Sequence, residues 1–170
     1  MTGLQEFALL AKEAAAAVDR REAQFPARVD AGKLAPEQAA LEIRVWRAIA
    51  ADWHWVVTLE RQTVESVTLE EKLAAIEESL RRADKALNKA FHASDERIRR
   101  QWTEGMSMLT IADFFGDDAR PFLEAWDRFY AIADLLEWAK RDMPGSDRPP
   151  ISHYVEREIA RNAQDRRRAA

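Results

Sequence analysis

The chain has 170 residues, of which 47% are hydrophobic and 33% are charged, with only five glycines and six prolines. This composition is typical of a helix-rich globular protein and excludes a disordered or fibrous chain. The lack of cysteine excludes disulfides and zinc–thiolate sites. The net charge of −4 argues against a nucleic-acid binder whose whole surface is basic.

The distribution of apolar residues predicts no membrane span. The longest run without Lys, Arg or Glu extends only from Ala48 to Leu59 and contains Asp52 and His54, far short of the roughly 20 apolar residues that a spanning helix needs. The first 21 residues lack a basic leader before an apolar block. We therefore expect a cytoplasmic protein without a membrane contact.

The first 62 residues are predicted to form a long helical hairpin. Apolar residues at helical spacing predict a first helix over residues 3–24, which Pro26 should end or kink because proline removes a backbone donor. Gly32 suits the position after a helix end, and Pro36 suits a first turn. A second helix is expected from Pro36 to about residue 62, before a run of β-branched residues.

Tryptophans crowd the middle of that second helix, and one carboxylate lies among them. At 100° per residue, Trp53 and Trp55 diverge, so both are predicted to be core or interface residues, while His54 lies on a polar strip. Asp52 projects into the apolar arc and is interpreted as a buried structural acid. Because an unpaired buried carboxylate is costly, it should pair with an arginine of another helix.

A third long helix is expected over residues 68–91. Thr68 and Glu71 match a capping box at its start. Its apolar positions alternate steps of four and three, which is typical of a coiled-coil-like seam: Leu69, Leu73, Ile76, Leu80, Ala83, Leu87 and Ala90.

Shorter helices and one linker complete the chain. Three helices are predicted, the first ending at about Glu104, the second at Gly116 and the third at about Arg141. Residues 143–150, which contain proline and glycine, are predicted to be a linker. The expected fold is an all-α bundle of five to seven helices. Its domains are a bundle over 1–142, the linker, and a C-terminal helix with a basic arm over 151–170.

One stretch resembles a known group of sequences. It has an aromatic–Pro pair, a valine in a short turn, Gly–Lys, and an Ala-rich helix closing on Ala–Asp, carried here by Phe25, Pro26, Val29, Gly32, Lys33, Ala39, Ile43, Ala48, Ile49, Ala51 and Asp52. This pattern is similar to small, uncharacterised helical proteins of bacterial and phage or prophage genomes. The resemblance covers residues 25–53 and implies a helical hairpin and a mobile-element origin, with no catalytic activity.

Enzymatic motifs are sparse. Glu124 and Asp127 fit one of the two carboxylate motifs of a metal-dependent nucleotide hydrolase, but the partner motif Glu-x-x-Glu is missing. The three histidines are scattered, so neither a nucleophile–base pair nor a metal site is indicated. We expect no catalytic residue, no bound metal and no cofactor, and a nucleotide hydrolase is the second alternative.

The C-terminal arm carries the densest basic cluster. Arg161, Arg166, Arg167 and Arg168 are candidates for contact with nucleic acid or a partner. The leading hypothesis is nevertheless a non-enzymatic helical adaptor that binds a protein partner or itself, because long amphipathic helices and abundant tryptophan suit protein interfaces. A nucleic-acid-binding accessory protein is the first alternative.

Overall fold

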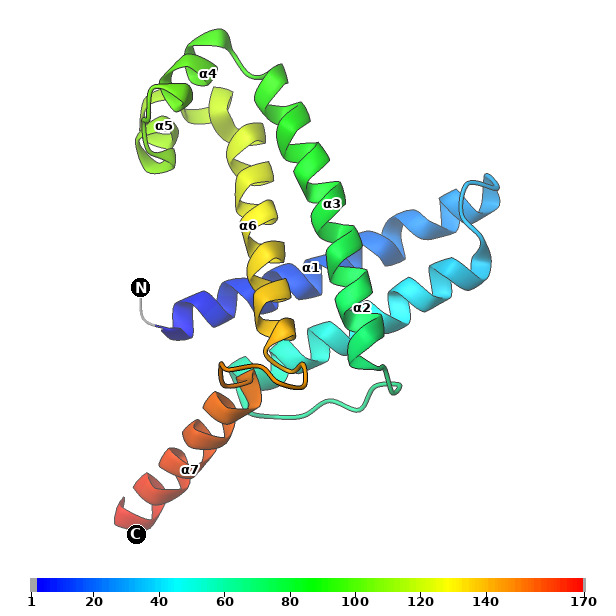
Figure 1. Ribbon diagram of the computed structural model, residues 1–170, viewed down its shortest axis with the longest axis vertical. Coiled ribbons are helices and arrows are strands. Elements are labelled where there is room, and N and C mark those ends of the chain that lie inside the picture. Colours follow the sequence, from blue (N-terminus) through cyan, green and yellow to red (C-terminus); the bar gives the residue numbers. More distant parts are fainter. Residues whose placement is uncertain (1–2, 170) are drawn as a thin grey trace. The chain divides into compact units, whose positions relative to one another are not determined.

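The computed structural model describes residues 3–169, with side chains from residue 6 onward. All regular secondary structure in this part of the chain is helical (Figure 1). The elements are α1 (Gly3–Asp30), α2 (Pro36–Thr58), α3 (Leu69–Ala93), α4 (Glu96–Thr103), α5 (Met108–Phe115), a 3₁₀ turn η1 (Gly116–Ala119), α6 (Arg120–Lys140) and α7 (Ile151–Ala169). The all-α prediction of five to seven helices is confirmed. None of the described helices is both long and apolar enough to cross a membrane.

The chain divides into two compact units. One is built from the chain up to Ile76 together with the chain from Asp134 onward, and the other is Glu77–Ala133. We call them the hairpin unit and the inserted unit. Residues 1–142, expected to form one bundle, contribute to both units, and α7 belongs with α1 and α2.

Helices α1 and α2 pack together as the predicted hairpin. The expected boundary of the first helix at residue 24 is wrong, because α1 continues through Pro26 to Asp30. Pro26 lies in the penultimate turn and is exposed, so only the hydrogen bond to the carbonyl of Glu22 is lost. Gly32 lies in the turn that follows α1, where its φ of 68° suits glycine, and Lys33 donates its backbone N–H to the carbonyl of Arg28 at 2.9 Å.

The second helix is shorter than expected. It begins at Pro36 as predicted but ends at Thr58, where Leu59 takes a left-handed conformation with φ 64° and donates its N–H to the carbonyl of Trp55. An irregular segment, residues 60–67, then leads to α3 and is exposed over almost its whole length. The helix thus ends before the β-branched run that starts at Thr63, at a point where Val56, Val57 and Thr58 are themselves β-branched.

The capping box of α3 is present, with both of its reciprocal hydrogen bonds formed. The backbone N–H of Glu71 donates to the Thr68 hydroxyl at 3.1 Å, and the N–H of Thr68 donates to the Glu71 carboxylate at 2.9 Å. Of the apolar seam of this helix, Ile76 and Ala83 are buried and the other five positions are half-buried. A coiled-coil pairing of this seam stays a prediction.

Tryptophan side chains form part of the core of the hairpin unit. Trp46 is fully buried, and Trp53 and Trp55 are 5% and 8% exposed, which confirms the prediction that they are core residues. Trp53 and Trp138 each contact Phe7, with ring centroids 6.0 and 5.4 Å away, and the two indoles lie 6.4 Å apart. These rings join α1, α2 and the end of α6.

The inserted unit has its own core. Its buried centre consists of Ile98, Ile111, Ala119 and Phe122. Around it pack half-buried residues from α3, α4, α5, α6 and the turn before α5, namely Leu87, Phe91, Trp102, Met106, Met108, Phe115, Leu123 and Trp126. The short helices α4 and α5 begin with side-chain caps from Asp95 and Ser107, which compensate for their length of only eight residues.

Candidate interaction surfaces

Asp52, expected to be a buried acid paired with an arginine, is neither. Its carboxylate is 41% exposed and pairs with Lys72 of α3 at 2.6 Å. Lys72 lies in the first turn of α3. A half-exposed pair of this kind contributes little stability, so Asp52 has a local structural role in the hairpin unit.

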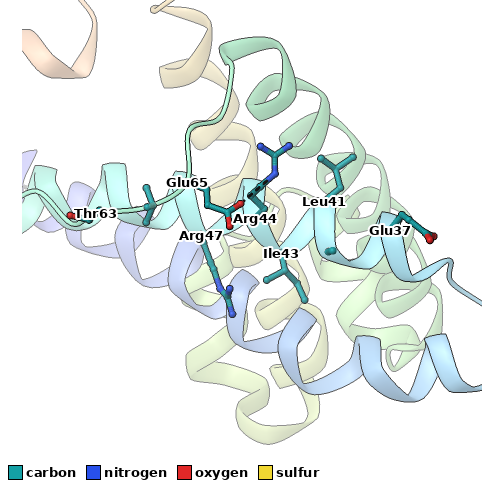
Figure 2. Close-up of a pocket in the computed structure, with 9 residues that line it drawn as sticks. Glu37, Leu41, Ile43, Arg44, Arg47, Thr63 and Glu65 are labelled. Atoms are coloured by element: carbon teal, nitrogen blue, oxygen red, sulfur yellow. Dashed lines mark ion pairs between the residues drawn. The ribbon is translucent and has the colours of Figure 1, made fainter.

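A shallow groove of about 820 Å³ runs along α2 beside the irregular segment (Figure 2). Figure 2 shows Leu41 and Arg44 leaving α2 on one side and Ile43 and Arg47 on the other, with the segment from Thr63 to Glu65 running beside α2. The groove is lined by Glu37, Ala40, Leu41, Ile43, Arg44, Arg47, Thr63, Val64 and Glu65. The lining of the groove therefore combines apolar side chains with side chains of both charge signs.

Arg44 fixes the irregular segment against α2. Its guanidinium donates to the backbone carbonyl of Ser66 at 3.0 Å and to the Glu71 carboxylate at 2.7 Å, and its Nε lies 4.0 Å from Glu65. The backbone N–H of Thr68, together with Arg44, lowers the pKa of Glu71. Because Glu71 stays ionised, the arginine is held in place and the wall of the groove is preformed.

The second arginine of the groove is anchored on the other helix of the hairpin. Arg47 donates twice to one carboxylate oxygen of Glu22 in α1, at 2.6 and 2.9 Å. Its side chain nevertheless remains 58% exposed. The guanidinium face is therefore available to a partner while its position is set.

Helix α5 of the inserted unit exposes two large apolar side chains. Leu109 is 80% exposed and Phe114 is 75% exposed, the highest values for large apolar residues in the described part of the chain. Ile111, between them in sequence, is fully buried. Exposed apolar residues of this size indicate an interaction surface when they are contiguous.

The predicted basic arm is a regular helix. Arg161, Arg166, Arg167 and Arg168 all lie on α7 and are exposed. Arg161 pairs with Glu158 of the same helix, whereas the three terminal arginines make no ion pair with any described residue. The arm is attached at its first turns, where Val155 is 2% exposed and Tyr154 contacts Trp138.

The carboxylates considered for a nucleotide hydrolase lie on α6. Glu124 and Asp127 are both exposed. Among residues 3–169, no three His, Asp or Glu side chains gather closely enough to hold a metal ion. The described residues thus offer no preformed metal site around this motif.

Sequence reasoning missed the groove. Arg44 and Arg47 stand out in the sequence as part of a polar strip on an otherwise apolar helix, but nothing in the pattern places residues 63–65 beside them. Arg157 was also missed, since it lies one turn before the terminal cluster that drew attention.

Comparisons of the chain with protein-family models, with curated proteins and with solved structures found no match.

Proposed function

We propose that the protein is a non-enzymatic adaptor that binds a protein partner through the groove on α2. The observation that supports this proposal is the mixed lining of the groove, in which Leu41, Ile43 and Val64 are apolar and are flanked by charged side chains. Protein interfaces have an apolar centre with a polar rim, and arginine is enriched in them.

The preformed wall of the groove favours binding. Arg44 and Arg47 are each held by acidic residues of neighbouring elements, so less side-chain freedom is lost when a partner docks. The volume of about 820 Å³ suits one or two turns of a partner helix or a short peptide rather than a whole domain surface. A second copy of this chain is the other partner that the proposal admits.

A phage or prophage role is part of the proposal. It rests on the resemblance of residues 25–53 to helical proteins of such genomes, and this stretch includes all six α2 residues that line the groove. A small protein from a mobile element that binds one host or phage protein would need only such a surface.

The groove can be blocked without disturbing the core. Ala40 is exposed and lines the groove, so Ala40→Trp fills it with a bulky side chain. The control is Ala15→Trp on α1, an exposed alanine outside the groove in the same unit.

Tagged wild type and both variants would be used to capture proteins from nuclease-treated lysate of the cells in which the protein occurs. We expect a stoichiometric protein that the wild type and Ala15→Trp retain and that Ala40→Trp loses by at least tenfold. Equal capture by all three would contradict binding in the groove. Sedimentation of the purified chain distinguishes self-association from binding of another protein.

A further inference from the structure

The outward side of α7 carries a stripe of basic and amide side chains. At about 100° per residue, one sector of roughly 120° collects His153, Arg157, Arg161, Gln164, Arg167 and Arg168. All six are exposed. We call this set the α7 stripe, and it contains no acidic residue.

The stripe lies opposite the side by which α7 docks. Ile151, Val155, Glu158 and Asn162 are the buried or half-buried positions of the docked side, and they fall in the opposing sector of the helix. The packing that holds α7 on the hairpin unit therefore leaves the whole stripe accessible. The acidic residues Glu156 and Asp165 flank the stripe without entering it.

We propose that the α7 stripe binds the phosphate backbone of a nucleic-acid duplex. Arg157, Arg167 and Arg168 make no ion pair with any described residue, so their charges are available. From Arg157 to Arg168 the helix rises about 16 Å. This length matches the distance spanned by about five phosphates along one strand of a duplex.

The chemistry of the stripe favours a nucleic acid over an acidic protein. Its cations are all arginines, which donate in a fork that fits phosphate oxygens, and the side chains of His153 and Gln164 can also donate hydrogen bonds. It holds no large apolar residue, whereas a protein interface needs an apolar centre.

Charge distribution agrees with this assignment. Helix α7 holds five of the chain's 26 basic residues and only three of its 30 acidic residues. The helix is therefore positive on a protein that is otherwise negative, so a polyanion is attracted to α7 and repelled elsewhere. This binding goes beyond the proposed adaptor function, which uses a different surface.

The test measures binding of the full chain to fluorescent 30-base-pair DNA and RNA duplexes by anisotropy, with poly-glutamate as the acidic-protein probe. Three or four arginine–phosphate contacts predict that affinity falls by roughly 40- to 150-fold between 50 and 200 mM salt. The two duplex arms show whether DNA, RNA or both are bound.

Two matched double variants test whether binding occurs on the α7 stripe. Arg157→Gln with Arg168→Gln removes two stripe charges and should reduce the slope of log affinity against log salt by about 1.8. Lys33→Gln with Arg166→Gln removes the same charge off the stripe, because Arg166 lies toward the docked side, and should leave most of the slope intact. Circular dichroism confirms that both variants keep their helix content.

Three results would overturn the proposal. These are no binding of either duplex at 50 mM salt, equal losses in the two double variants, or poly-glutamate bound as tightly as the duplexes. The last result would assign the stripe to an acidic protein. None of them bears on the groove, whose test is carried out after nuclease treatment.

Discussion

At the scale of single residues, burial separates aromatic side chains that look alike in the sequence. Phe122 is 1% exposed and lies at the centre of the inserted unit, whereas Phe114, eight residues earlier, is 75% exposed. The apolar stripe of the last long helix predicts Phe122 as a core residue, whereas nothing in the apolar stretch around Phe114 marks that residue as exposed.

Alanine substitution of these two phenylalanines should have very different effects. Phe122→Ala leaves a cavity and is expected to lower the free energy of unfolding by about 3–5 kcal/mol. Phe114→Ala should change it by less than about 0.5 kcal/mol. Urea denaturation followed by circular dichroism measures both, and similar losses would contradict the packing described for α5.

Asp142 gives the hairpin unit a pH dependence. Asp142 is an exposed residue, but partial desolvation of its carboxyl group raises its pKa despite the attraction of Lys72, and the charge of Asp52 raises it further. The ionised form therefore disfavours folding above the raised pKa, and this penalty disappears below the ordinary value of 3.8.

Asp142→Asn should consequently increase the free energy of unfolding at pH 7, with no increase at pH 3. Denaturation midpoints of the wild type and the variant at the two pH values provide the measurement. A variant less stable than the wild type at pH 7 would show that the carboxylate contributes favourable contacts that outweigh its desolvation.

At the scale of elements, the sequence was most informative where local chemistry decides the structure. The capping box of Thr68 and Glu71, the first-turn Pro36 and the glycine after α1 act within a few residues, and all three were predicted correctly. The continuation of α1 past Pro26 was not predicted, because it depends on how strongly the rest of α1 is held against α2. Tertiary packing outweighed one lost hydrogen bond.

Replacing this proline tests that explanation. Pro26→Ala restores a backbone donor to Glu22 and removes the ring clash, so the free energy of unfolding should rise by about 1–2 kcal/mol after allowance for the freer unfolded chain. Thermal and urea denaturation would measure the change. A loss of stability would mean that the proline ring makes favourable contacts at the end of α1.

Helix α7 depends on its docked side. Val155 is its one fully buried side chain in the described residues, and a lone helix of this length is marginal in water. Val155→Asp should therefore release α7 and speed amide hydrogen exchange along it at least tenfold, while α1 and α2 keep their protection. Unchanged exchange in α7 would show that the helix does not need this contact.

At the scale of the whole molecule, the sequence predicted the class of fold but not the division of the chain into two compact units. Periodicity shows which face of a helix is apolar, yet the seam of α3 continues without a break from Leu69 to Ala90 although Ile76 and Ala83 belong to different units. The groove was likewise not predictable, since it depends on where residues 63–65 pass. Pairings between distant segments leave no local pattern.

Two units with separate cores predict unfolding in two steps. In Phe122→Ala, amides of α4 and α5 should lose hydrogen-exchange protection at denaturant concentrations where α1 and α2 remain protected. Loss of protection in all helices at one concentration would contradict the independence of the two cores.

The groove on α2 is the central functional claim, and a photo-cross-linking residue placed at position 40 tests it most directly. Position 15 on α1 serves as the reference, and adducts formed in cells would be identified by mass spectrometry. We predict one protein cross-linked from position 40 and not from position 15. The same adducts from both positions, or none from position 40, would contradict the account.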